Sequence, residues 1–259
     1  MTTFFRSLYR KLKDHPLPVG TIINEAYRIT GHLGAGSFGL AYIAVQSETD
    51  SPCVLKQLRP SRSKMDDQKQ FLHEVDVLKM IHHPAVPRYL DHFTNAGRTF
   101  IAMTYVEGEN LEDVLFDQKR AFSEKESLKL ITDVVGVVAD LHLHEVFHGD
   151  LRTPNMILRH GALSIIDFGL ARTGSQGLSE EQKTRHALED LYDAGDLLLF
   201  LLYSTFQTKR KKALPWTEEL TLHPATTTLL KRLLGIDQPF HNAIEAEEAL
   251  KSTLTMVRA

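Results

Sequence analysis

The chain has few of the features that would tie a protein to an oxidising compartment or to a lipid bilayer. It contains one cysteine, Cys53, in 259 residues, so no disulfide can form within it and a reducing compartment is expected. Its longest purely apolar stretches, such as residues 197–203, are far too short to span a membrane. Arg6 and Arg10 interrupt the apolar residues that a signal peptide would need. We therefore expect a cytoplasmic protein without a transmembrane segment.

The sequence also lacks an excess of charge of either sign. The formal net charge is −3, which predicts no general attraction to nucleic acid or to an anionic membrane. Hydrophobic residues make up 42% of the chain and charged residues 24%, as in an ordinary soluble protein with a full core. The length suits one large domain or two lobes that share a cleft.

Residues 1–13 form a basic segment with an apolar face. Phe4, Phe5, Leu8 and Leu12 lie at helical spacing among arginines and lysines, and prolines follow soon after. One interpretation is a basic amphipathic helix that touches a membrane surface or a partner. The other is an extension that packs on the first lobe, and such a short apolar face fits this second interpretation better.

A second basic run consists of Lys209, Arg210, Lys211 and Lys212. Four consecutive cations could meet an acidic partner or nucleic acid, although a solvated loop is the commoner role of such a run. The thirteen histidines are scattered and form no ligand set with cysteine, so no zinc site is expected.

Three glycines in a G-x-G-x-x-G pattern, Gly34, Gly36 and Gly39, follow a strand pattern that begins at Tyr27. A dinucleotide-binding loop of this pattern would open a helix. Here β-type sequence follows at residues 40–45, so the loop joins two strands. Glycine in such a loop lets backbone N–H groups approach a phosphate without obstruction by side chains.

Lys56 lies inside the next apolar strand candidate, residues 53–58. It could be an edge lysine that extends to water, or a lysine that grips phosphate. Residues 66–82 then predict an amphipathic helix with Phe71, Val75 and Leu78 on one face, and Glu74 lies on the same side. Taken alone, this acid could be an ordinary solvated glutamate.

The second half of the chain is predominantly helical. After strand candidates at 86–92 and 99–103, a short helix is expected at 111–116, and Ser123 caps a long helix that runs to about His144. Residues 148–169 then place Asp150 and Asn155 on one loop and Asp167 on the next, joined by an apolar hairpin. One acid can accept a proton from a hydroxyl, while the other acid and the amide hold Mg²⁺ against phosphate oxygens.

Taken in order, these features resemble the eukaryotic-like (Hanks-type) protein kinases, in particular small soluble bacterial Ser/Thr kinases with a shortened activation segment. The resemblance covers about residues 27–255. It implies an α+β, two-lobed protein kinase fold with an antiparallel-sheet N-lobe (21–103), a hinge (104–109) and a mainly helical C-lobe (110–259), after a basic extension at 1–20. The implied activity is transfer of the γ-phosphate of ATP to Ser/Thr hydroxyls.

The resemblance also implies a role for each motif residue. Asp150 would be the catalytic base, Asn155 and Asp167 would bind Mg²⁺, and Glu74 would orient Lys56 on the α- and β-phosphates. Arg152 stands where Ser/Thr kinases have a lysine, which is not a neutral exchange. The implied ATP site consists of Gly34, Gly36, Gly39, Ala41, Val54, Lys56, Met103 as gatekeeper, Thr104, Val106, Asn110 and Ile157.

Three departures from the family pattern accompany one another. Gly149 replaces the arginine that reads a phosphate on the activation loop. About twenty residues separate Phe168 from 190–195, which resemble the start of the family's buried supporting helix, and no A-P-E motif lies between. His241 stands where a late arginine would pair with the A-P-E glutamate. We therefore expect no activation-loop phospho-switch, and control by a partner, by dimerisation or by the Glu74 helix.

Three functions remain open at this point. A protein kinase would phosphorylate protein substrates and itself, with Thr173, Ser175, Ser179 and Thr184 as candidate acceptors. The His-Gly-Asp form also occurs in small-molecule phosphotransferases and in a small atypical kinase, so a metabolite kinase or ATPase is the second hypothesis. The third is a nucleotide-binding pseudokinase scaffold.

Overall fold

The computed structural model describes residues 14–36, 39–62, 64–207 and 214–257. The chain divides into two compact units, Met1–Val106 and Glu107–Ala259, and the division falls within the expected hinge. Three sequence features lie outside the described residues: the segment 1–13, the middle of the glycine loop at 37–38, and the basic run at 209–212.

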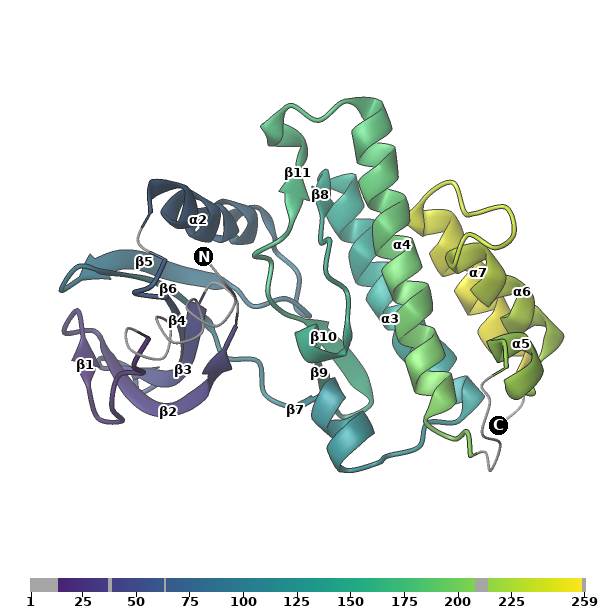
Figure 1. Cartoon of the computed structure of the whole chain (residues 1–259), viewed down its shortest axis with the longest axis horizontal. Helices are drawn as coiled ribbons and strands as arrows, with labels where there is room; N and C mark the ends of the chain where they lie inside the picture. Colours follow the sequence, from purple (N-terminus) through teal and green to yellow (C-terminus); the bar gives the residue numbers. More distant parts are fainter. Residues whose placement is uncertain (1–13, 37–38, 63, 208–213, 258–259) are drawn as a thin grey trace, which may run out of the picture. The chain divides into compact units, whose positions relative to one another are not determined.

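The first unit is built on a six-stranded antiparallel sheet with the order β1-β2-β3-β4-β6-β5 (Figure 1). Its strands are β1 (Ile22–Ile23), β2 (Tyr27–Ala35), β3 (Gly39–Gln46), β4 (Pro52–Leu58), β5 (Tyr89–Asn95) and β6 (Arg98–Thr104). Helix α2 (Met65–Met80) packs against β5 and β6. The strands around the glycine loop, the strand of Lys56 and the helix of Glu74 thus lie where the sequence predicts them.

Strict alternation along β3 and β4 gives the sheet two different faces. Tyr42, Ala44, Cys53 and Leu55 point into the core and are fully buried. The residues that alternate with them along the two strands, Lys56 among these, are only partly buried. Because successive side chains of a strand point to opposite faces, one face packs this core and the other carries Lys56.

The described part of the N-terminal extension packs on this unit. The carboxylate of Asp14 accepts hydrogen bonds from Arg59 Nη1 at 2.9 Å and from the backbone N–H of Ser61 at 2.9 Å. The backbone N–H of Leu17 donates to the hydroxyl of Tyr42 at 3.2 Å, and the Leu17 side chain packs against the core. Burial raises the pKa of Asp14, but the bonds from Ser61 and Arg59 outweigh it, and the net pKa is lowered.

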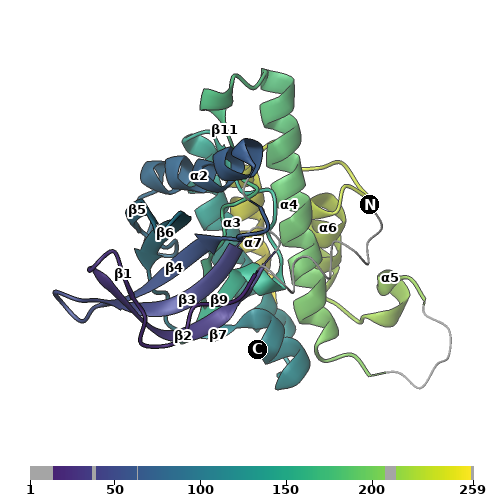
Figure 2. The ribbon, with the colours of Figure 1, turned by 60° about the vertical axis from the view of Figure 1, so that its left-hand side comes forward.

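Helices dominate the second unit. They are α3 (Glu124–Leu143), α4 (Glu180–Tyr203), α5 (Trp216–Glu219), α6 (Pro224–Leu233) and α7 (Ala243–Met256), with the short turns η1 (Asp113–Asp117), η2 (Thr153–Asn155) and η3 (Gly174–Gln176). Helices α3 and α4 lie side by side in both views (Figures 1 and 2). At Gly195 of α4 a Cβ atom would lie 2.9 Å from Leu233 of α6, so the glycine permits their close packing.

Two small sheets present the loops of the second unit. One contains β7 (Glu109–Asn110), β9 (Met156–Arg159) and β10 (Ala162–Ile165), and the other pairs β8 (Val146–Phe147) with β11 (Arg172–Thr173). The β9–β10 hairpin turns at His160 (φ 50°) and Gly161 (φ 76°). Two consecutive positive φ angles are the signature of the turn that fits the twist of a tight hairpin.

The structure corrects three boundaries. The strand expected at 86–92 begins at Tyr89, because residues 83–86 form a turn and Pro87 has no N–H to donate. The short helix at 111–116 is mostly a π-helical turn. Helix α4 begins at Glu180, ten residues before Asp190, which the sequence placed at the start of the helix. Among the described residues, no helix combines the length and apolarity needed to cross a membrane.

Candidate active site

The first unit contributes a buried ion pair. Nζ of Lys56 on β4 lies 2.6 Å from Oε2 of Glu74 on α2, and the two side chains are 16% and 2% exposed. Glu74 points into the unit because it shares the buried face of α2 with Phe71, Val75 and Leu78. The structure thus brings together the two residues that the sequence analysis paired, and it excludes the solvated role for Glu74.

The face of the sheet that carries Lys56 also carries several residues of the expected ATP site. Ala41 lies directly opposite Lys56 in the β3–β4 pairing, and Val54 lies opposite Met103 in the β4–β6 pairing. Directly opposed residues share a face of the sheet, so these four side chains line one surface.

The ends of the glycine loop are held by backbone pairing. The N–H of Gly36 donates to the carbonyl of Gly39 at 2.9 Å, and Gly34 pairs with Ala41. A Cβ atom on Gly39 would lie 3.2 Å from Cγ of Lys56 and 3.2 Å from the carbonyl oxygen of Gln57. A side chain at Gly39 would therefore crowd the stem of Lys56.

Backbone groups of the expected hinge are partly in use. The N–H of Thr104 donates to the carbonyl of Arg88 at 2.9 Å, and the Thr104 hydroxyl accepts from the N–H of Arg88 at 2.8 Å. The N–H of Thr104 is thus engaged within the unit, so any backbone recognition of an adenine by this residue would use its carbonyl oxygen.

The second unit contains the catalytic loop. Nδ2 of Asn155 lies 2.7 Å from Oδ2 of Asp150 and 2.9 Å from the backbone carbonyl oxygen of Asp150. Nε of Arg152 lies 2.9 Å from Oδ1 of the same carboxylate. These contacts fix the orientation of Asp150. They also turn the amide nitrogen of Asn155 toward Asp150, so the amide oxygen is the atom suited to a cation.

The next loop brings Asp167 after the β9–β10 hairpin. Asp167 is exposed and has a left-handed backbone with φ 64°, and its Oδ1 accepts from the N–H of Gly169 at 3.2 Å. The N–H of Ile166 donates to the carbonyl of Asn155 at 2.9 Å, which ties the two loops together. A carboxylate and an amide oxygen are hard donors that suit Mg²⁺ when phosphate and water complete its coordination.

His148 lies under the catalytic loop and is fully buried. Its Nδ1 accepts from the N–H of Asp150 at 3.2 Å, and its ring packs edge-on against Phe168 with centroids 4.7 Å apart. Burial lowers the pKa of His148, opposed by the charges of Asp190, Asp167 and Asp150. A neutral imidazole that accepts at Nδ1 therefore supports the loop.

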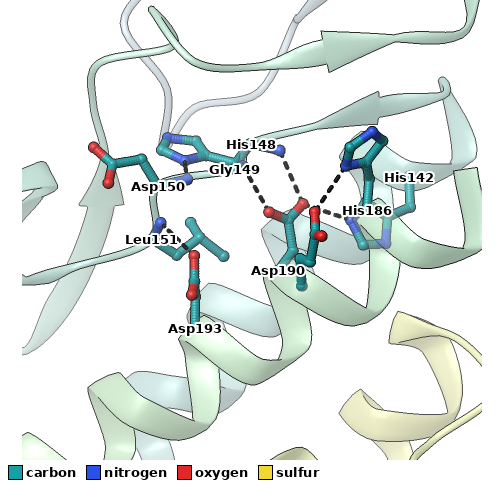
Figure 3. A network of polar contacts seen from close by, with 9 residues as sticks. His142, His148, Gly149, Asp150, Leu151, His186, Asp190 and Asp193 are labelled. Atoms are coloured by element: carbon teal, nitrogen blue, oxygen red, sulfur yellow. Dashed lines mark hydrogen bonds and ion pairs between the residues drawn. The ribbon is translucent and has the colours of Figure 1, made fainter. Parts of the chain in front are cut away.

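Asp190 anchors the catalytic loop from below (Figure 3). Its carboxylate is fully buried and accepts from the N–H of His148 at 2.8 Å and from the N–H of Gly149 at 2.7 Å. Nε2 of His142 on α3 lies 2.9 Å from the same carboxylate. The sequence indicated that this helix supports the loop, but it did not identify Asp190 as the group that binds it.

A second carboxylate of α4, Asp193, also meets the loop (Figure 3). Its Oδ2 accepts from the N–H of Leu151 at 3.3 Å, one residue beyond Asp150. Burial, together with the charges of Asp190, Asp150 and Asp196, raises the pKa of Asp193 to about 6 despite that hydrogen bond. Sequence reasoning missed this residue, because one acid on an amphipathic helix carries no distinguishing pattern.

Gly149 has a backbone conformation that favours glycine. Its φ is +71°, and a Cβ atom there would lie 3.2 Å from the carbonyl oxygen of Leu170. L-residues reach this left-handed region only with strain. The glycine that replaces an arginine thus has a local conformational reason as well as the regulatory one suggested by the sequence.

Strand pairing, a backbone hydrogen bond and an ion pair within the chain hold the segment after Asp167. Strand β11 pairs with β8, the N–H of Gly174 donates to the carbonyl of Glu145 at 2.9 Å, and Lys183 pairs with Glu145 at 2.6 Å. Of the candidate acceptors, Thr173 is buried, and Ser179 caps α4 by accepting from Gln182.

Asn110 and Ile157 are neighbours in the β7–β9 pairing, and Nδ2 of Asn110 donates to the carbonyl of Pro154 at 2.8 Å. Asn110 thus braces the catalytic loop from the side.

In the region of His241, Arg232 pairs with Glu245 at 2.6 Å, and Glu245 also accepts from the N–H of His241. The ion pair of Arg232 and Glu245 therefore holds the loop of His241, in place of the family's pair between a late arginine and the A-P-E glutamate.

Comparison with known proteins extends this picture to the whole chain. The sequence profile of the protein kinase domain matches residues 27–235. The kinase domain of PknI from Mycobacterium tuberculosis superposes with a TM-score of 0.68 at 20% identity, covering 92% of this chain and 99% of that chain. This structural likeness shows the two-lobed kinase fold expected from the sequence.

Two curated relatives are similar in sequence. "Probable serine/threonine-protein kinase YbdM" of Bacillus subtilis is 42% identical over 251 residues, 96% of this chain and 98% of that protein. "Serine/threonine-protein kinase B" of Synechocystis is 30% identical over 58% of this chain but only 28% of its own length. With a family match over most of its length and a full-length relative at this identity, the chain belongs to the protein kinase family.

Proposed function

We infer that this chain is a serine/threonine protein kinase that transfers the γ-phosphate of ATP to protein hydroxyls, its own included. The observation that carries the proposal is the geometry around Asp150, whose carboxylate is held by Asn155 at 2.7 Å and Arg152 at 2.9 Å. A carboxylate fixed in this way can accept the proton of an incoming hydroxyl. The YbdM relative supports the Ser/Thr assignment.

The remaining roles follow from the chemistry of each group. Lys56, held by Glu74, would neutralise phosphate charge, and the glycine loop would offer its N–H groups to the same phosphates. Arg152 lies beside Asp150 and would stabilise charge on the transferred phosphoryl group. The nucleoside would contact Ala41, Val54, Met103, Thr104, Val106, Asn110 and Ile157.

Asn155 and Asp167 would hold Mg²⁺. The amide nitrogen of Asn155 faces Asp150, so its oxygen is the suited ligand, and Asp167 offers an exposed carboxylate. When bound, Mg²⁺ neutralises charge that develops on the phosphate oxygens. Asp190 would support both proton acceptance by Asp150 and Mg²⁺ binding by Asn155, because it fixes the backbone of the loop that begins with His148 and Gly149.

We further propose that activity needs no phosphate on the activation segment. Gly149 offers no cation for such a phosphate, and the segment is anchored instead by β11, Glu145 and Lys183. Control would then fall to a partner, to a second copy of the chain, or to the position of α2, which carries Glu74.

A cytoplasmic location is also proposed. The single thiol, Cys53, is buried, and burial raises its pKa to about 11, so it is poorly suited to redox chemistry.

Neither alternative function gains support. The groups needed for phosphotransfer are all present, which does not favour a scaffold: Lys56, Glu74, Asp150, Asn155 and Asp167. The curated relatives are named as protein kinases rather than metabolite kinases, which does not favour a metabolite kinase.

The test is incubation of the purified chain with labelled ATP, Mg²⁺ and a generic basic protein. We expect label on serine or threonine of the protein, and none with Asp150→Ala or Lys56→Met. ATP-dependent thermal stabilisation without transfer would indicate a scaffold. ATP turnover without any phosphoprotein would indicate a metabolite kinase or ATPase.

A further inference from the structure

A groove between η1 and α4 of the second unit has no role in the chemistry described above. It encloses about 520 Å³ and is mainly apolar. Phe116 of η1 and Phe200 of α4 face each other edge to face with centroids 6.2 Å apart, and they are 53% and 45% exposed. Its other lining residues are Leu115, Lys119, Asp196, Leu199, Tyr203 and Ser204. Exposed aromatic side chains that line a groove favour binding of an apolar group.

The groove continues from the catalytic loop along one helix. Asp193 bonds the N–H of Leu151, next to Asp150, and Asp196 lies one turn further along α4, where it lines the groove with Phe200. Seven residues of helix separate Asp193 from Phe200, a rise of about 10 Å at ~1.5 Å per residue. An extended peptide covers that distance in about three residues. A hydroxyl at Asp150 and an apolar side chain in the groove would thus be about three residues apart.

Charge defines the occupant further. The turn η1 carries the exposed Asp113 and Asp117, and α4 contributes Asp193 and Asp196, whereas Lys119 is the cation among the lining residues. Apart from Arg152 beside Asp150 and Lys119 at the groove, the charged residues named along this path are acidic. A segment that fits it would combine an apolar residue, basic residues and a serine or threonine.

Residues 1–13 have this chemistry. The segment contains four basic residues and no acid, and Ser7 lies three residues after Phe4 and three before Arg10. The phenyl group of Phe4 matches the apolar groove. Arg6 lies between Phe4 and Ser7 and matches the carboxylates of Asp193 and Asp196, which lie between the groove and Asp150.

We propose that residues 1–13 are a substrate of this kinase, with Ser7 as the phosphate acceptor and Phe4 seated in the groove against Phe116 and Phe200. The proposal rests on the kinase activity inferred above. The hydroxyl oxygen of Ser7 forms a bond to the γ-phosphorus of ATP, the bond from that phosphorus to the β–γ bridging oxygen breaks, and ADP leaves. Asp150 takes the hydroxyl proton.

The test offers a synthetic peptide of residues 1–13 to the full chain carrying Ser7→Ala, so that only the added peptide can be labelled at this serine. We expect label on Ser7 of the peptide. Phe200→Ala should lower kcat/KM for the peptide about tenfold, mainly through KM, as expected for one buried aromatic contact. Phe4→Ala in the peptide should do the same.

Pairing the two changes gives the sharpest readout. If Phe4 occupies the groove, Phe200→Ala has little further effect on the Phe4→Ala peptide, because both changes remove one contact. Phe116→Ala serves as a second groove variant, and Ile244→Ala and Asp237→Asn, exposed residues on other elements, serve as controls with unchanged rates.

Two results would overturn the proposal. Additive effects of Phe4→Ala and Phe200→Ala would place Phe4 elsewhere, and an unlabelled Ser7 beside a labelled generic basic protein would leave the kinase activity intact while removing this substrate. Failure to label either substrate would instead refute the kinase activity itself.

Discussion

Replacing Asp190 by asparagine tests how the catalytic loop is supported. The carboxylate accepts from two backbone N–H groups, at 2.8 and 2.7 Å, and lies 2.9 Å from Nε2 of His142. An amide has one accepting oxygen, so in either orientation its NH₂ group faces a donor. At least one of the two N–H groups, the buried one of His148 or the part-buried one of Gly149, loses its partner. An unsatisfied buried donor costs about 1–3 kcal/mol, and loss of a charged acceptor brings the total to about 3 kcal/mol.

The assay compares urea unfolding of the wild-type chain and Asp190→Asn at pH 7. We expect the free energy of unfolding to fall by about 3 kcal/mol. The rate of phosphotransfer should fall by more than the loss of folded protein accounts for, because a shift of the loop by about 1 Å can cost about 100-fold in rate. The control is Asp133→Asn on α3, an exposed carboxylate paired with Lys129, whose loss should cost under about 1 kcal/mol. If Asp190→Asn unfolds and reacts like this control, Asp190 does not hold the loop.

Three further predictions concern the same site. At Gly149, where φ is +71°, alanine should lower the free energy of unfolding by about 1–2 kcal/mol, and asparagine by less, because asparagine tolerates that conformation; equal losses in urea titrations would contradict this. The pKa of Asp193 is raised to about 6 from its usual value of 3.8, so the native state binds more protons between these values and Asp193 loses stabilising effect as pH rises through that range. Between pH 4 and pH 7 the wild type should therefore lose more stability than Asp193→Asn, and parallel stability profiles would argue against this burial. Lys56→Met should remove the ion-pair partner of the buried carboxylate of Glu74, so adding Glu74→Gln should restore stability but not activity; a double variant no more stable than Lys56→Met would show that the pair is not coupled.

The sequence predicts those parts of the fold that have a local physical signature. The helix that begins after Ser123 was expected from its cap, and the structure shows the complete capping box with Glu126. The pairing of Lys56 with Glu74 came from the resemblance to protein kinases, because the strand and helix patterns place each residue but do not join them. The structure places them 2.6 Å apart.

Other features depend on contacts between distant segments. Helix α4 starts ten residues earlier than expected, although the capping box of Ser179 and Gln182 could have indicated that start. Asp190 and Asp193 act on backbone groups about forty residues away in the sequence, and no periodicity reveals such partners. The left-handed conformation of Gly149 likewise comes from the bonding of the loop, because glycine by itself permits many conformations.

The most direct measurement compares the initial rate of phosphotransfer before and after complete dephosphorylation of the chain, with mass spectrometry to verify that the segment between Asp167 and Ser179 carries no phosphate. Asp150→Asn provides the inactive reference. We predict equal rates within about twofold for the two wild-type samples and loss of at least about 100-fold for the variant, at the lower end of what a general base contributes. A drop of tenfold or more on dephosphorylation, or full activity of Asp150→Asn, would contradict phosphotransfer at Asp150 without an activation-segment phosphate.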